Sequence, residues 1–175
     1  TLKGHGPKDF TELCMQAAEI MLMQGKVAEN KEEARKMLEE VVASGKAFET
    51  FKDMVKAQGG NVDMIENPEL LPQSKFKTEI KSEESGNVKV LHSEKLGVLA
   101  MQLGAGRETK EQDVNHAVGL ELACKRGDKV NKGDTICIVY HDEELKPQWI
   151  DELYHAFELT NEEVAPQPII EKVLS

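Results

Sequence analysis

Residues 67–81 read NPELLPQSKFKTEIK, and the hydrophobic pattern of the chain changes its period within this stretch. The two prolines interrupt both helices and central strands, because proline has no amide hydrogen and a fixed φ. Beyond them Phe76, Thr78 and Ile80 alternate with lysine and glutamate, which is the pattern of a half-buried strand. The stretch therefore predicts a boundary between a helical part and a part that contains strands.

The residues before this boundary predict helices. Asp9 followed by Glu12 matches a capping box, and Asn30 followed by Glu33 repeats the signal. Gly25 is expected to close the first helix in a left-handed conformation. Three helices are predicted, with apolar stripes at Leu13, Ala17, Ile20 and Met21, at Ala34, Met37, Leu38, Val41 and Val42, and at Ala47, Phe48, Phe51, Met54 and Val55.

The residues after the boundary predict short strands and two helices. Ser93 is expected to cap a helix that runs to Leu103, and Pro147 to begin a helix that extends to Phe157. The predicted strands follow residue 76, include Val88 and Val90, and then cover residues 117–123, 136–140 and, as an edge strand, 164–173. The predicted fold class is therefore α+β.

A repeated Gly-Asp motif lies in this second part. Gly127-Asp128 and Gly133-Asp134 fit G-D-x-V-x-x-G-D-x-I, which resembles the turns of biotinyl and lipoyl carrier domains. Carriers place their modified lysine on a hairpin tip about midway through the domain, whereas this repeat leads into the Pro147 helix without a symmetric hairpin. We interpret the glycines as tight turns of a barrel-sandwich-like sheet. A stand-alone biotinyl- or lipoyl-like binding module is the alternative.

Composition excludes several classes of partner. The chain has 22 basic and 32 acidic residues and a net charge of −10, which disfavours binding to a phosphate backbone. No apolar run approaches the roughly 18 residues that span a membrane. Cys14, Cys124 and Cys137 form no C-x-x-C pair, so we expect reduced thiols in a cytoplasmic protein rather than a zinc site or a disulfide framework.

One segment carries candidate chemistry. Gly104-Ala105-Gly106-Arg107 combines glycine amides, which can bind an anion, with an arginine fork that suits phosphate. Its spacing is neither G-x-G-x-x-G nor a P-loop, and the residues alone favour a mobile loop. No histidine pair has metal-ligand spacing, and no Ser-His-Asp or Cys-His pattern is present. The residues by themselves therefore name no reaction and no metal site.

Several short stretches follow one another in a recognisable order. They are residues 1–7 with 9–13, 43–47, 51–60, 71–72, 103–107, 117–119 and the two Gly-Asp turns. In this order they resemble the C-terminal part of pyrimidine-nucleoside phosphorylases, which are close relatives of thymidine phosphorylase. The resemblance covers essentially the whole chain. It implies a homodimer that splits a pyrimidine nucleoside with phosphate into free base and (2-deoxy)ribose 1-phosphate, with a potassium ion in the bacillary-type enzymes.

The resemblance also implies a division of the chain. Residues 1–72 correspond to the last helices of the phosphorylase catalytic module, and residues 73–175 to its C-terminal hammerhead-like domain. The 104–107 segment lies near the substrate cleft in relatives, so Arg107 is expected to contribute to closure. His116 follows this loop and is assigned no catalytic role.

The family's phosphate-binding, base-recognising and potassium-binding residues lie upstream of the part that this chain resembles. The chain opens on Thr1 without a methionine, which is expected of a C-terminal fragment and equally of a chain that lost a tag or its first methionine. We therefore predict that the chain has no catalytic or metal-binding residue, that it is inactive alone, and that the N-terminal part of the same protein is its partner. A structural protein that docks partners on its helical hairpins is a third alternative.

Overall fold

The computed structural model describes residues 1–173 and confirms the α+β class. The chain forms two compact units, of which one contains residues 1–70 with the tail from residue 168, and the other contains residues 71–167. The assignment of residues 1–72 and 73–175 to two family domains stays a prediction.

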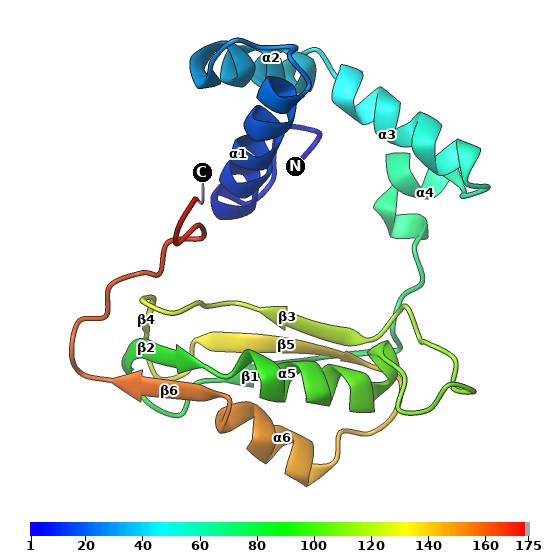
Figure 1. The fold of residues 1–175 in the computed structure, drawn as a ribbon. Helices are drawn as coiled ribbons and strands as arrows, with labels where there is room; N and C mark the ends of the chain where they lie inside the picture. Colours follow the sequence, from blue (N-terminus) through cyan, green and yellow to red (C-terminus); the bar gives the residue numbers. More distant parts are fainter. Residues whose placement is uncertain (174–175) are drawn as a thin grey trace. The chain divides into compact units, whose positions relative to one another are not determined.

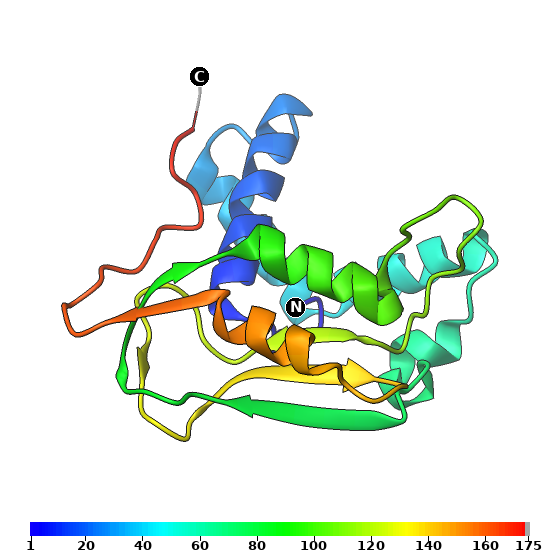
Figure 2. The same cartoon turned by 90° about the horizontal axis from the view of Figure 1, so that it is seen from below.

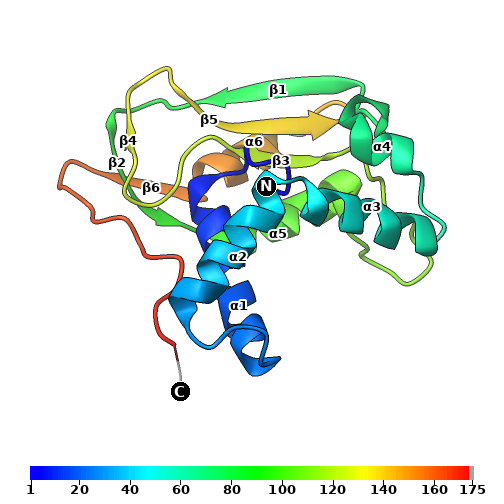
Figure 3. The ribbon, with the colours of Figure 1, turned by 90° about the horizontal axis from the view of Figure 1, so that it is seen from above.

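The first unit is helical. Its elements are α1 (Lys8–Gln24), α2 (Lys31–Ala43), α3 (Lys46–Ala57), α4 (Val62–Glu66) and a 3₁₀ turn, η1 (Pro68–Leu70). The first three confirm the predicted helices, and α1 packs against α2 (Figures 1 and 3). The sequence did not predict α4, which is only five residues long and too short to show a period.

The predicted capping box of the first helix is wrong. Pro7 occupies the N-cap position, and α1 begins at Lys8 without a side-chain cap. Asp9 therefore lies inside the first turn, where its carboxylate accepts a hydrogen bond from the amide of Phe10 at 2.8 Å. The fixed φ of proline prepares the chain for a helix, so the helix begins earlier than a polar cap at Asp9 would allow.

The left-handed residue at the end of α1 is Lys26, with φ 56°, and not Gly25, with φ −75°. The helical turn continues through Gly25, and the amide of Val27 then donates to the carbonyl of Leu22 at 2.9 Å. This hydrogen bond is the one that closes a Schellman motif, in which the residue after the C-cap is left-handed. The prediction failed because the helix extends one residue further.

Of the two hydrogen bonds of the capping box predicted for α2, one is present. The Asn30 side chain accepts a hydrogen bond from the amide of Glu33 at 2.9 Å. The Glu33 carboxylate accepts from the amide of Glu29 at 2.8 Å rather than from that of Asn30. The Asn30 cap thus satisfies one free amide of the first turn, and the second bond of the motif comes from Glu29, the residue before the cap.

An arginine joins α1 to α2. The Arg35 guanidinium donates to both carboxylate oxygens of Glu12, at 3.0 and 2.8 Å, and its Nε contacts the buried carboxylate of Glu19. The guanidinium holds the pKa of the Glu12 carboxyl below its usual range. This network fixes the pairing of the two helices through charge-assisted hydrogen bonds.

The helical unit has little apolar core of its own. Among its described residues, only Ala28 and Ala34 are buried apolar residues. Phe10, Met21 and Met54, in contrast, are between 49% and 70% exposed. Most residues of the apolar stripes on these helices are only partly buried in this chain.

The second unit contains two antiparallel sheets. In the first, β1 (Phe76–Lys81), β5 (Thr135–His141) and β3 (Gly119–Leu122) lie in the order β1-β5-β3. In the second, β4 (Lys129–Val130), β2 (Gly86–Leu91) and β6 (Phe157–Thr160) lie in the order β4-β2-β6. Helices α5 (Ser93–Ala100) and α6 (Pro147–Tyr154) lie side by side, as Figure 2 shows.

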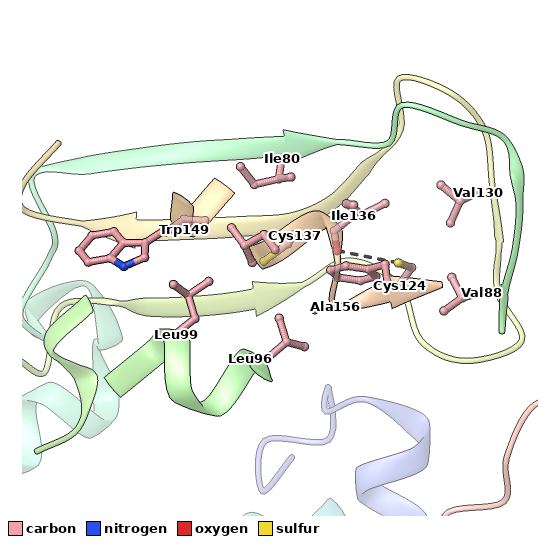
Figure 4. Packing of buried hydrophobic residues seen from close by; sticks show 13 residues of the cluster. Ile80, Val88, Leu96, Leu99, Cys124, Val130, Ile136, Cys137, Trp149 and Ala156 are labelled. Carbon is pink, nitrogen blue, oxygen red and sulfur yellow. Dashed lines mark hydrogen bonds between the residues drawn. The ribbon is translucent and has the colours of Figure 1, made fainter. Parts of the chain in front are cut away.

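Both sheets and both helices share one core, so the arrangement is sandwich-like (Figure 4). Leu99 of α5, Leu153 of α6 and Val139 of β5 are almost completely buried in it. Val88 and Phe157 bring the second sheet into the same cluster. The core is mainly aliphatic, and its large aromatic members are Trp149 and Phe157.

The prediction of the last strand is wrong. The strand covers residues Phe157–Thr160 and pairs with β2, with Leu159 opposite Val88. Residues 164–173 contain no strand, and the prolines at 166 and 168 cannot donate to a ladder. Helix α6 ends at Tyr154, so Phe157 belongs to the strand rather than to the helix. The predicted helix included Phe157 because its apolar pattern continues past the end of α6.

The Gly-Asp repeat forms two tight turns, as interpreted. Gly127 and Gly133 have φ values of 95° and 92°, and each following aspartate accepts a hydrogen bond from a backbone amide of its own turn. Asp128 accepts from Lys125 at 2.7 Å, and Asp134 accepts from Asn131 at 2.8 Å. The turns flank β4 and set up its pairing with β2.

Candidate functional site

The 104–107 segment begins inside a helix and ends in a loop. Gly104 and Ala105 belong to a single π-helical turn, Met101–Ala105, that continues α5. Gly104 has φ 107°, which ends this turn, and Arg107 is exposed beyond it. A π-helical turn is often found at functional sites. The predicted loop therefore starts one to two residues later than expected.

The loop is closed at its neck. The backbone amide of Asn115 donates to the carbonyl of Gly104 at 2.9 Å, so residues 105–114 leave and re-enter the domain at one place. Gly106 lies against Met101, because a Cβ at that position would be 3.1 Å from the Met101 Cγ. Inside the loop the Gln112 side chain accepts from the amide of Glu108 at 2.9 Å.

The Asn115 side chain anchors this neck. Its Oδ1 accepts from the amide of Ala117 at 3.0 Å, and its Nδ2 donates to Asp142 Oδ2 at 2.7 Å. The other oxygen of Asp142 accepts from the amide of Lys75 at 2.8 Å. The hydrogen bond from the Lys75 amide, followed in size by the one from the Asn115 side chain, holds the pKa of the Asp142 carboxyl below its usual range.

A buried histidine stands beside this anchor. His141 Nδ1 donates to the carbonyl of Glu143 at 2.6 Å, which leaves Nε2 to accept from the Thr78 hydroxyl at 2.8 Å. Phe76 stacks on the ring with a centroid distance of 5.4 Å. Both ring nitrogens are occupied, so His141 is a structural residue here and not a free base. His116, at the neck, is exposed.

A polar pocket of about 250 Å³ lies next to the loop. It is lined by Glu108, Lys146 and Glu152, with Trp149 under the ammonium group of Lys146 at 4.4 Å from its ring centroid. Two carboxylates outnumber the one cation. The pocket therefore does not offer the converging positive charge that a phosphate needs.

The buried cysteines are not nucleophiles. Burial, with a smaller contribution from Asp128, raises the pKa of the Cys124 thiol to about 11. Burial also raises the pKa of the Cys137 thiol to about 12, with Cys124 and Glu121 adding to the shift. A thiol with such a pKa stays protonated at neutral pH and is inert.

Within residues 1–173, no three His, Cys, Asp or Glu side chains are placed to share a metal ion. The same residues include no helix of the length and apolar character needed to cross a bilayer. The described site thus consists of one exposed arginine on an anchored loop, without a base, a nucleophile or a cation cluster beside it.

Comparison with known proteins identifies the kind of domain. A model of the family described as "Pyrimidine nucleoside phosphorylase C-terminal domain" matches residues 87–160. The chain is 40% identical over 169 residues to the pyrimidine-nucleoside phosphorylase of Bacillus subtilis (strain 168), covering 97% of the chain and 39% of that protein. It is also 40% identical over 175 residues to the enzyme of that name from Staphylococcus aureus (strain USA300), covering 100% of the chain and 40% of that protein.

Residues 87–160 therefore match a pyrimidine-nucleoside phosphorylase C-terminal domain, and the predicted resemblance of the chain to the C-terminal part of these enzymes is confirmed. The chain spans about two fifths of the length of the curated relatives it matches.

Proposed function

We propose that this chain serves as the C-terminal part of a pyrimidine-nucleoside phosphorylase. In the proposed reaction a pyrimidine nucleoside and phosphate give free base and (2-deoxy)ribose 1-phosphate. The observation that carries the proposal is the 40% identity over essentially the whole chain to proteins of that name. The net charge of −10 agrees with a small-molecule substrate rather than a nucleic acid.

In this proposal the 175 residues alone are inactive. Phosphorolysis needs a positioned phosphate and donors that stabilise an oxocarbenium-like sugar and a departing base anion. Arg107 on one loop cannot supply both ends of that site. The bound phosphate, and the potassium ion that the resemblance implies, are assigned in this proposal to residues outside this chain, because the family's phosphate-binding and potassium-binding residues lie upstream of the part that the chain resembles.

The proposed partner of the chain is the N-terminal part of the same protein, in a cytoplasmic homodimer. The partly buried apolar stripes of the helical unit, together with its exposed Phe10, Met21 and Met54, support this proposal, because exposed apolar surfaces mark sites of association. A further support is an apolar pocket of about 480 Å³ between α1, α2 and the first residues. Its lining includes Leu2, Met15, Leu38 and Val42.

Arg107 is proposed to act in closure of the site. An ordered loop excludes water, so that phosphate and not water attacks the sugar. In the full-length protein, Arg107→Ala is expected to lower kcat for phosphate-dependent uracil release from uridine by about tenfold, which corresponds to about 1.4 kcal/mol. Uracil release is measured with and without phosphate, so that loss of phosphorolysis is separated from gain of hydrolysis.

Lys110→Ala is the matched control, because Lys110 is an exposed cation of the same loop. It is expected to change kcat by less than about twofold, since surface charges away from the reacting groups contribute little. Unchanged phosphorolysis in Arg107→Ala would show that the arginine has no part in closure. Equal losses of kcat in the two variants would show that the effect comes from the net charge of the loop and not from Arg107 in particular.

A further inference from the structure

The loop that carries Arg107 is held at its neck by two side chains. Asn115 lies where the loop re-enters the domain, and Asp142 follows the last residue of β5. Their side chains meet at 2.7 Å, and both are partly buried. The pair is the side-chain link between the neck of the loop and the sheet.

Each member of the pair is itself fixed by a backbone amide. Asn115 Oδ1 accepts from Ala117 at 3.0 Å, which sets the direction of its Nδ2. Asp142 Oδ1 accepts from Lys75 at 2.8 Å, at the entry to β1. Because β1 pairs with β5 at this end, with Phe76 opposite His141, the aspartate stands on a rigid base.

The link reaches Arg107 through a short path. The amide of Asn115 also holds the carbonyl of Gly104, and Arg107 is only three residues from that glycine. A shift of the neck would therefore be passed directly to the arginine. Side chains that contact a substrate need to be held close to the productive geometry by packed, hydrogen-bonded neighbours.

We propose that Asn115 and Asp142 form a positioning pair, which anchors the neck of the 105–114 loop to the end of β5 and thereby orients Arg107 for closure over the substrate. The part of this inference that concerns closure rests on the proposed function. The part that concerns anchoring does not, since it follows from the hydrogen bonds alone. Neither residue touches a reacting atom, so both are positioning residues.

The pair permits an exchange test that keeps the composition of the protein constant. Asn115→Asp places a carboxylate against Asp142, and Asp142→Asn places two amide groups where only one donor is needed. The exchange variant, Asn115→Asp with Asp142→Asn, restores every bond. The carboxylate at position 115 then accepts from the amide of Ala117 and from the side-chain amide at position 142, whose oxygen still accepts from Lys75.

The first readout is tryptic cleavage after Arg107 in the full-length protein. Both single variants are expected to be cut faster at this bond, by about fivefold or more, because a released loop opens at a lower free-energy cost. The exchange variant is expected to return to the wild-type rate within about twofold. Cleavage after Arg126, in the same digest, reports whether the whole domain has loosened.

The second readout is kinetic. The single variants are expected to lower kcat for phosphate-dependent uracil release more than they change KM, and the exchange variant to recover most of kcat. The anchoring role would be overturned if trypsin cleaved the single variants after Arg107 at the wild-type rate. It would also be overturned if the exchange variant were cleaved as fast as the single variants. Wild-type protein that shows the expected tryptic pattern but releases no base would instead overturn the proposed function and leave the anchor intact.

Discussion

Leu99→Ala is expected to lower the free energy of unfolding of the 71–167 unit by about 3 kcal/mol. Leu99 is 1% exposed and lies in the core cluster that both sheets and both helices share. Removing its side chain deletes buried methyl groups and leaves a cavity that the surrounding core side chains fill only in part. Urea unfolding followed by the fluorescence of Trp149, the single tryptophan of the chain, measures the change.

Val98→Ala is the matched control for this substitution. Val98 precedes Leu99 on the same helix but is 43% exposed. Its truncation is expected to change the free energy of unfolding by less than about 0.5 kcal/mol. Equal effects at the two positions would mean that the face of α5 assigned to the core is wrong.

Gly127→Ala is expected to destabilise the same unit by about 3 kcal/mol, from two separate causes. Gly127 has φ 95°, where an alanine is strained by about 1–2 kcal/mol. A Cβ there would also stand 2.8 Å from the Cα and 2.9 Å from the nitrogen of Pro166, which are backbone atoms that cannot turn away. The second cause adds an overpacking cost of about 1–3 kcal/mol.

Gly133→Ala separates these causes, because Gly133 has the related φ of 92° and no heavy atom lies within 4 Å of the position that a Cβ would take there. It is expected to cost only the conformational strain of about 1–2 kcal/mol. The difference between the two variants in urea unfolding then measures the contact with Pro166. If the two variants are equally stable, the segment around Pro166 does not pack on the first turn.

The local features of the fold were predictable from the sequence where one short signal decides them. The Asn30 cap, the proline that begins α6 and the two Gly-Asp turns each depend on residues within three or four positions. The errors came where two local signals compete. Pro7 is the N-cap residue of α1, so the helix begins before the position that the capping signal at Asp9 predicts. Phe157 pairs with β2 as part of a strand, although it lies in an apolar cluster that resembles a helix face.

The pairing of the strands was not predictable in this way. β5 lies between β1 and β3, and the partners Ile80 and Cys137 are separated by most of the second unit. Pairing at this separation is decided by the shared core rather than by any local period. Four of the five predicted strands were therefore correct in place and the last was wrong, while the order of the strands in two sheets had to come from the structure.

In the candidate site, too, the local features were predictable from the sequence and the long-range contacts were not. The glycines and the arginine of the 104–107 segment were visible in the sequence, because their residue types suit an anion. The anchor was not visible, since Asn115 bonds to Asp142, which in turn bonds to Lys75, and no spacing rule connects such distant positions. Only the capacity of asparagine to bond its own backbone two residues on, seen here at Ala117, offered a local signal.

We propose that this chain is the C-terminal part of a pyrimidine-nucleoside phosphorylase and that the catalytic residues of the enzyme lie outside it. The most direct test is uracil release from uridine, with and without phosphate, by the purified 175-residue chain beside the full-length protein. We expect phosphate-dependent release by the full-length protein and none by the chain alone. Phosphate-dependent release by the chain alone would contradict it and place the catalytic groups among the residues described here.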